Sequence, residues 1–285
     1  MPRCWLALIC SCLLSDALRV VASELPSLAI CVCIKDQAVD VREWIVYHRA
    51  LGVQKLYIWD TGSTPPLLVG HLRMQNALVR FERARLSLQD AVRDFVTAGV
   101  VHYEYDAEVR PKAGTHGPQV ALYDRCLRRW GAAHTFMAFI DTDEFIVLRD
   151  ATSDLPALLQ DYEGHGGVVV NWEVFGSGGL QVRPKGNAMM SYWRCSPRTH
   201  PVSTLHEPVL GPKSKEPVLE RWALHHYAVK SVDDFQQKMT RGSGMGNIKT
   251  LAFLQYVDNF TDDYCPDALD MGLQLNNLMA LQRAL

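Results

Sequence analysis

Hydrophobic runs alternate with amphipathic segments of helical period along the first half of the chain. The runs are rich in β-branched or aromatic residues and predict buried strands at residues 28–34, 55–59, 100–105 and 135–140. Between them, apolar residues at helical spacing predict helices at 41–51, from 88 to just before Gly99, and at 119–130. Repeated strand–helix alternation is typical of α/β domains, so we expect a mostly parallel sheet with helices on both faces.

The second half of the chain has shorter and less regular hydrophobic segments. The pattern there predicts a helix at 154–163, a strand at 167–172, mostly loop at 176–216, and a short helix capped by Ser231 and Gly242. The sequence contains no internal repeat and no low-complexity segment. We therefore predict one α/β domain over residues 27–260, with a loop-rich C-terminal region, and a helical extension at 261–285.

The N-terminal segment carries a hydrophobic run of a different character. Residues 5–14 are mostly apolar, follow Arg3, and precede small residues that end at Ala22. As a helix this run is too short for a bilayer core of about 30 Å, so a secretory signal peptide over residues 1–22 is the favoured interpretation. A signal-anchor and an ordinary buried helix are the alternatives. The sequon at 259–261 agrees with entry into the secretory pathway.

The amino-acid composition and net charge exclude some classes of protein. The 285 residues are 48% hydrophobic and have a formal net charge of −2, which suits a folded domain with a sizeable core. This balance excludes a disordered acidic segment. Because a nucleic-acid partner normally requires a basic excess, we expect none.

The cysteines do not form a scaffold that holds the fold. Of eight, Cys4, Cys10 and Cys12 precede the expected cleavage site, which leaves five. We expect at most one or two disulfides and at least one free thiol among these. Cys31 and Cys33 lie two apart in the first predicted strand, so they share a face, and we expect them to be buried thiols.

An acidic cluster follows the fourth predicted strand. Asp141, Asp143 and Glu144 stand in the sequence IDTDEF. On extended backbone the two Asp side chains point the same way and Glu144 points the opposite way. Ligands of open α/β sheets bind beyond the carboxyl ends of strands, and paired carboxylates there are stable when a cation neutralises them. A divalent metal ion is the favoured interpretation, and a solvated turn is the alternative.

A second cluster of polar residues lies near the C-terminal end of the predicted domain. His226, if it lies at a strand end, is a candidate nitrogen ligand for the same metal, whereas packing or hydrogen bonding is the favoured interpretation of His225 and His226 taken in isolation. Lys230 and Arg241 are candidates for holding phosphate oxygens. The glycine-rich loop 242–246 offers backbone N–H groups to an anion.

Five motifs in this order resemble those of glycosyltransferase family 92, a GT-A-fold family of nucleotide-sugar-dependent enzymes. They are IKD at 34–36 with EWIVYHRALGV at 43–53, YIWDTGS at 57–63, IDTDEF at 140–145, NWEVFGS at 171–177, and HHYAVKS at 225–231 with KMTRG at 238–242. The resemblance implies a GT-A-like, Rossmann-type sheet with a loop-rich C-terminal acceptor region.

The resemblance also implies how a UDP-sugar donor would be held. Asp141 and Asp143 would bind Mn²⁺, or another divalent cation, on the sugar-nucleotide diphosphate, with His226 as a third ligand. Lys230 and Arg241 would neutralise the leaving diphosphate. These roles are those of the matching family motifs.

Further roles follow from the same resemblance. The residues expected to face the nucleoside are Lys35, Asp36 and Asp60. Trp172 and Phe175 would line the sugar or acceptor pocket, and Glu173 is the candidate general base.

The implied reaction is the inverting transfer of a sugar, with galactose suggested by the family, to a hydroxyl of a glycan acceptor. The signal segment implies the secretory pathway, in the Golgi lumen or at its membrane, or secretion after cleavage. The interval between Cys195 and His225 is shorter than in the family, so an inactive or carbohydrate-binding protein is an alternative. An Asp-x-Asp phosphatase is a third reading, less favoured because that chemistry normally uses the first strand of its domain.

Overall fold

The computed structural model describes residues 25–64, 72–74, 77–79, 87–111, 117–150, 152, 154–204 and 221–284. The expected signal segment at 1–22 and most of the shortened interval before His225 lie outside these residues. Among the described helices, none has both the length and the apolar character that crossing a membrane requires.

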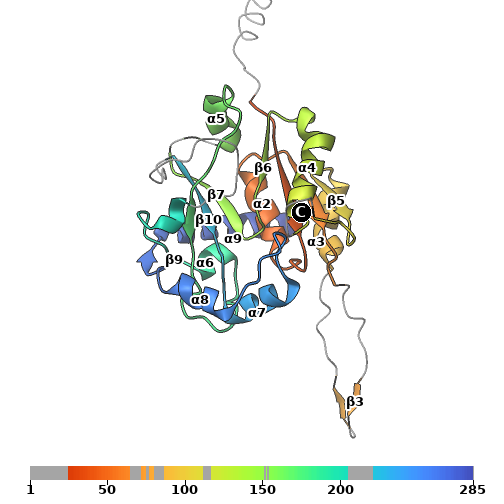
Figure 1. Ribbon diagram of the computed structural model, residues 1–285, viewed down its shortest axis with the longest axis vertical. Coiled ribbons are helices and arrows are strands. Elements are labelled where there is room, and N and C mark those ends of the chain that lie inside the picture. The colour runs from red at the N-terminus through yellow and green to blue at the C-terminus, as the bar shows by residue number, and fades with distance from the viewer. Residues whose placement is uncertain are drawn as a thin grey trace, which may run out of the picture.

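A parallel four-stranded sheet forms the centre of the N-terminal half (Figure 1). Its strand order is β5 (Val101–Tyr105), β2 (Lys55–Asp60), β1 (Leu28–Ile34) and β6 (Phe136–Phe139). The chain connects these strands through the helices α2 (Val41–Ala50), α3 (Leu88–Thr97) and α4 (Gln119–Trp130). The predicted strand–helix alternation and the α/β fold class are confirmed. The chain also contains a short hairpin of β3 (Leu72–Met74) and β4 (Ala77–Val79).

The helices cover both faces of this sheet. Because side chains alternate along a strand, Ile30 and Val32 of β1 pack into the core shared with α2 and α3. Ala29 and Cys31 point to the other face, where they pack against α4. β1 is therefore buried on both sides, as its continuous hydrophobic run predicts.

The cysteines divide into two disulfides and one free thiol in the described part of the chain. Cys31 is bonded to Cys126 of α4, so the expectation that it is a free thiol is wrong. Cys33 is the free cysteine, half-buried on the same face of β1. The second disulfide joins Cys195 to Cys265.

A second, three-stranded sheet follows the first. β7 (Glu144–Leu148) pairs antiparallel with β10 (Trp222–His226), which pairs parallel with β8 (Trp172–Val174). The strand predicted at 167–172 thus begins only at Trp172. Val168 and Val170 pack against the core without strand pairing, which explains their hydrophobic pattern.

Helix α2 is tied to β7 by side-chain hydrogen bonds. The indole N–H of Trp44 donates to the carbonyl of Glu144 at 2.8 Å, and the Tyr47 hydroxyl donates to that of Ile146 at 2.8 Å. Among the described strands β7 lies at the edge of its sheet, and helix α2 covers this edge through these two hydrogen bonds. The EWIVYH segment of α2 therefore fixes the start of β7, which immediately follows the acidic cluster.

The remaining elements are short, except at the C-terminus. In chain order they are the 3₁₀ turn η1 (Gly131–Ala133), α5 (Leu155–Leu159), η2 (Gln160–Tyr162), α6 (Ala188–Ser191), β9 (Arg194–Cys195), η3 (Pro201–Thr204), α7 (Val232–Arg241), α8 (Leu251–Asp258), β11 (Asp263–Tyr264) and α9 (Pro266–Ala284). α6, β9 and η3 are regular elements inside the segment predicted to be mostly loop. α9 packs against α2 and α6, and buries Ala268 and Leu275 completely.

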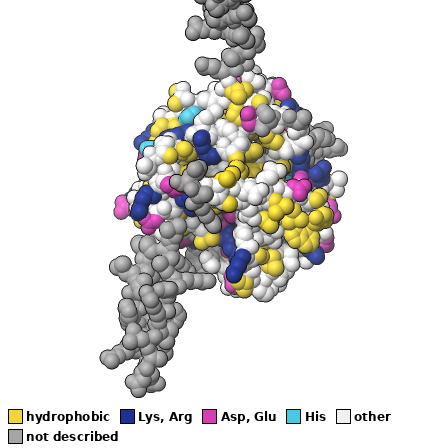
Figure 2. Space-filling model, turned by 180° about the vertical axis from the view of Figure 1, so that it is seen from behind, with side chains coloured by type: hydrophobic (Ala, Val, Ile, Leu, Met, Phe, Trp, Pro, Cys, Tyr) yellow, Lys and Arg dark blue, Asp and Glu magenta, His cyan; other side chains and the backbone are white. Residues whose placement is uncertain are grey.

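The molecular surface carries both signs of charge. The face turned away in Figure 1 shows acidic and basic side chains interspersed with hydrophobic ones (Figure 2). This mixture agrees with the net charge of −2. A local cluster of side chains of one charge therefore stands out against this mixed surface.

Candidate active site

A cleft of about 380 Å³ opens at the carboxyl ends of the parallel strands. Its walls come from the residues after β1, β2 and β5, the start of α4, the acidic cluster after β6, and the segment 238–249 of α7 and the loop beyond it. Pockets of about 300–1,000 Å³ are typical of small-ligand sites, and this edge of an α/β sheet is where ligands bind.

The acidic cluster forms a turn between β6 and β7. The backbone N–H of Glu144 donates to the carbonyl of Asp141 at 3.1 Å, and the Glu144 carboxylate accepts the Asp141 N–H at 2.7 Å. The expectation of extended backbone with Glu144 on the opposite side is therefore wrong. Because the chain turns, Asp141, Asp143 and Glu144 all line the cleft. The Thr142 hydroxyl donates to the Gln37 side chain, which joins this turn to the loop after β1.

The two aspartates have different partners. Asp141 accepts a hydrogen bond of 3.0 Å from the Gln119 amide at the start of α4. Asp143 is 5% exposed and accepts a bond of 2.6 Å from the Lys238 ammonium. Burial favours the protonated form of Asp143, but nearby positive charge, led by Lys238, outweighs it and holds the pKa of this carboxyl well below its usual range.

His226 lines the cleft at the end of β10, as predicted. Its ring lies 4.7 Å from that of Trp172, which lines the same cleft. Burial lowers the pKa of His226 to about 4, so the imidazole is neutral at pH 7. Within the described part of the chain its Nδ1 is buried and has no hydrogen-bond partner. A neutral imidazole nitrogen without a partner and the carboxylates that line the same cleft are donor types that a divalent cation accepts, although their atoms do not converge within 4.8 Å of one another here.

Among the described residues, the groups whose potential metal-ligating atoms lie within 4.8 Å of one another are outside the cleft, and Asp141, Asp143 and His226 do not form such a group. One joins Glu173 to Cys195 and Cys265, but these cysteines form a disulfide. The other contains Glu173, His225 and Asp267. The guanidinium of Arg149 already neutralises that group, because it pairs with both Glu173 and Asp267. We assign no metal to either.

Four cationic side chains line the cleft beside the carboxylates: Lys35, Lys238, Arg241 and Lys249. Lys35 and Arg241 also border a neighbouring polar groove that contains Asp36. Ammonium and guanidinium groups are the usual partners of phosphate oxygens. The cleft thus combines a metal-type donor set with the positive charge that a diphosphate needs.

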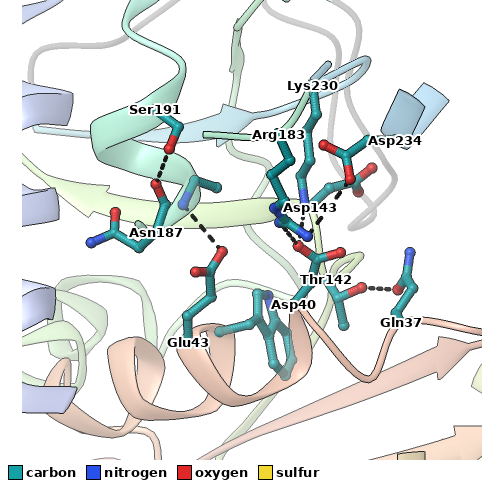
Figure 3. Close-up of polar contacts among 12 residues, drawn as sticks. Gln37, Asp40, Glu43, Thr142, Asp143, Arg183, Asn187, Ser191, Lys230 and Asp234 are labelled. Carbon is teal, nitrogen blue, oxygen red and sulfur yellow. Dashed lines mark hydrogen bonds and ion pairs between the residues drawn. The ribbon is translucent and has the colours of Figure 1, made fainter. Parts of the chain in front are cut away.

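Lys230, one of the predicted phosphate-binding residues, has a different position from Arg241. It is buried in the network beside the acidic turn, where its ammonium donates to Asp40 at 2.7 Å (Figure 3). Arg183 pairs with the same carboxylate and lies 3.7 Å from Asp234. These two cations hold the pKa of Asp40 at about 2 despite burial. Lys230 is not among the residues that line the cleft.

The three residues predicted to face the nucleoside do not all line the cleft. Lys35 lines the cleft, whereas the buried Asp60 shapes the turn after β2. Its carboxylate accepts the N–H groups of Gly62 and Ser63 at 3.1 and 2.7 Å. Asp36 has a φ of 54° and accepts the N–H of Thr64 at 2.7 Å. Both aspartates therefore fix backbone around the cleft.

The segment NWEVFGS places its residues on two sides of β8. Side chains alternate along a strand, so Trp172 faces the cleft while Glu173 and Phe175 point away from it. Phe175 is fully buried and stacks on Tyr227 at 4.6 Å. Phe175 therefore packs in the core and does not line the cleft.

Glu173 is also fully buried, where it pairs with Arg149 and lies 3.0 Å from His225. These groups outweigh the effect of burial and lower the pKa of Glu173 to about 2. The structure thus brings six predicted residues to the cleft and leaves five in supporting positions. The six are Lys35, Asp141, Asp143, Trp172, His226 and Arg241.

Several cleft residues have no role in the sequence-based assignment. The most informative is Lys238, which lies one helical turn before Arg241 on α7 and so shares a face with it. That spacing is a signal available in the sequence. Gln119 had no comparable signal, because its position depends on the packing of α4. Glu144 belongs to the predicted acidic cluster but was expected on the opposite side, because the turn after β6 was not predicted.

Comparison with known proteins identifies the family of this chain. The model of glycosyltransferase family 92 matches residues 27–192, more than half of the chain. The protein is therefore a member of a glycosyltransferase family. Specifically, it belongs to glycosyltransferase family 92, as its motifs indicate.

A curated relative supports the same assignment over a short segment. A glycosyltransferase family 92 protein of Oryza sativa subsp. japonica is 43% identical over 37 residues, which are 13% of this chain. The matched segment spans only 6% of that relative's length.

Proposed function

We propose that this protein is a metal-dependent glycosyltransferase that moves a sugar from a UDP-sugar to a glycan hydroxyl with inversion. One observation carries the proposal. A single cleft at the carboxyl ends of parallel strands contains Asp141, Asp143 and His226 together with four cationic side chains. Membership of glycosyltransferase family 92 supports the transferase class.

The proposed chemistry assigns a task to each side of the cleft. Asp141, Asp143 and His226 would hold Mn²⁺, which supplies electrostatic stabilisation to the departing diphosphate. Arg241 and Lys35 neutralise the remaining phosphate charge. The indole of Trp172 offers a flat apolar face against which a sugar ring can pack.

Inversion also requires a group that takes the proton of the acceptor hydroxyl. Glu173, the residue that the family resemblance suggests, is buried behind the cleft wall and paired with Arg149. We therefore propose the transfer without assigning its base to Glu173. Galactose as the sugar is a proposal that rests on the family alone.

We also propose that the protein works in the secretory pathway, in the Golgi or beyond it. Two disulfides, Cys31–Cys126 and Cys195–Cys265, support an oxidising compartment. The proposed signal peptide or anchor at residues 1–22 rests on the hydrophobic pattern of that segment.

A panel of UDP-sugars with and without Mn²⁺ tests the proposed function. We expect UDP release from at least one donor only with a divalent cation, and an inverted anomeric configuration in the product by NMR. Asp141→Asn and Asp143→Asn should each abolish release. Asp262→Asn is the matched control, because that carboxyl is 78% exposed.

No UDP release from any donor would contradict the proposal. Retained sugar binding in that case would favour a carbohydrate-binding protein instead.

A further inference from the structure

The ammonium of Lys238 is hydrogen-bonded to the carboxylate of Asp143, which is one of the proposed metal ligands. Lys238 Nζ donates to Asp143 Oδ2 at 2.6 Å and to the backbone carbonyl of Ala228 at 2.9 Å. The side chains of Lys238 and Asp143 are 19% and 7% exposed. This is a nearly buried ion pair that directly faces the cleft.

A divalent cation and this ammonium compete for the same carboxylate. Two positive charges a few ångströms apart repel each other strongly where water is scarce. Asp143 cannot bind a divalent cation at full strength while Lys238 remains on it. Binding of the ion at full strength therefore favours movement of Lys238 away from Asp143 Oδ2.

The surroundings of Lys238 allow this movement. Its helix α7 is held at its start, where Ser231 accepts the N–H of Asp234 at 3.2 Å and Tyr192 donates to the Asp234 carboxylate at 3.0 Å. A lysine side chain is a flexible stem that carries a point charge, and this one lines the cleft, into which its ammonium can turn. The helix can stay in place while the ammonium swings.

The displaced ammonium of Lys238 then needs another anion with which to pair. Arg241, one turn further along α7, lines the same cleft, so both cations face the volume in which a diphosphate would lie. Lys230 differs from Lys238 in this respect. It is held by Asp40 and does not line the cleft.

We propose that Lys238 is a resident counter-ion of Asp143 that a divalent cation displaces, and that the displaced ammonium then binds the donor diphosphate. This inference rests on the proposed donor site. It makes cation and nucleotide bind cooperatively, since each favours the position of Lys238 that the other needs. Cooperativity of this kind is reciprocal.

Mn²⁺ binding to the full chain, measured by electron paramagnetic resonance of the free ion with and without UDP, tests the proposal. Lys238→Met removes the charge and keeps the length of the side chain. We expect Mn²⁺ alone to bind this variant at least about 5-fold more tightly than wild type. The factor by which UDP strengthens Mn²⁺ binding should fall by at least about 5-fold.

Two matched variants separate displacement from a general effect of charge. Lys35→Met removes a charge that lies in the same cleft on the loop after β1. We expect it to strengthen binding of Mn²⁺ alone much less than Lys238→Met does. Lys238→Arg, which restores a positive charge, should return Mn²⁺ affinity toward wild type. If Lys238→Met does not fold, Lys238→Gln carries the same expectations.

Equal Mn²⁺ affinities of Lys238→Met and Lys35→Met, or an unchanged effect of UDP in Lys238→Met, would overturn the inference. Sugar transfer does not enter this measurement, so those results leave the proposed function standing. Failure of wild type and variants alike to bind Mn²⁺ would overturn both the inference and the metal dependence of the proposed function.

Discussion

The indole N–H of Trp44 donates a hydrogen bond of 2.8 Å to the backbone carbonyl of Glu144, so helix α2 holds the residue that closes the acidic turn. Both groups are buried. Tyr47 binds the carbonyl of Ile146 in the same way, one turn further along the helix. The geometry of the proposed metal site therefore depends on a helix that does not itself contribute a ligand.

Replacing Trp44 with Phe should destabilise the fold and loosen this turn. The buried Glu144 carbonyl would lose the indole donor, and loss of a buried hydrogen bond of this kind costs about 1–3 kcal/mol. We expect the free energy of unfolding, measured by urea denaturation, to fall by at least that amount. Trp193→Phe is the control, since that side chain is 37% exposed. Equal losses in the two variants would contradict a special role for the Trp44 bond.

The sequence pattern predicted the central sheet well, because the burial of each strand and helix is visible in its own short stretch of sequence. The continuous hydrophobic run of β1 and the helical spacing in α2 and α4 each report burial by the neighbouring elements. α4 matches its predicted bounds of 119–130. By contrast, the hydrophobic run near Val168 and Val170 reflects packing against the core without a strand partner, and sequence pattern does not separate the two cases.

The sequence predicted correctly those cleft residues that lie at the end of a strand or directly after it. Asp141, Asp143 and His226 reach the cleft for this reason. Glu173 and Phe175 do not, although strict alternation from Trp172 already indicates the opposite face. The contact between Lys238 and Asp143 joins residues from two distant segments of the chain, so it depends on the tertiary arrangement of α7 and the acidic turn.

Glu173→Gln tests whether this carboxylate supports the structure or takes the acceptor proton. Removing its charge leaves the buried Arg149 with the Asp267 carboxylate, and places a neutral amide beside His225. Breaking a buried ion pair from one side typically destabilises by about 3–5 kcal/mol, and the remaining Asp267 partner should keep the loss below that range. We expect a measurable loss of stability in urea denaturation, together with a lower melting temperature. An unchanged stability combined with abolished sugar transfer would show instead that Glu173 is the general base.

His48 should make stability depend on pH. This buried histidine contacts the Trp44 carbonyl through Nδ1 at 2.9 Å and accepts the Ile146 N–H through Nε2 at 3.4 Å, which requires the neutral ring. Burial lowers its pKa from 6.5 to about 4. The unfolded chain therefore takes up a proton first as pH falls. The stabilisation is complete above pH 6.5 and is lost as pH falls toward 4.

The contribution of His48 is isolated by comparing wild type with His48→Gln, because other buried groups titrate in the same range. The difference in unfolding free energy between the two should shift by up to about 3 kcal/mol against wild type between pH 7.5 and pH 4. Urea denaturation across this range measures it. A difference that stays constant with pH would mean that His48 is not held neutral by the fold.

The most direct test of the metal-dependent donor site is calorimetry of UDP binding to the full chain with and without Mn²⁺. We predict that wild type binds UDP tightly only when Mn²⁺ is present. Asp143→Asn should lose that Mn²⁺-dependent gain, while Asp262→Asn keeps it. UDP affinity that is the same with and without Mn²⁺ in wild type, or that survives unchanged in Asp143→Asn, would contradict the account.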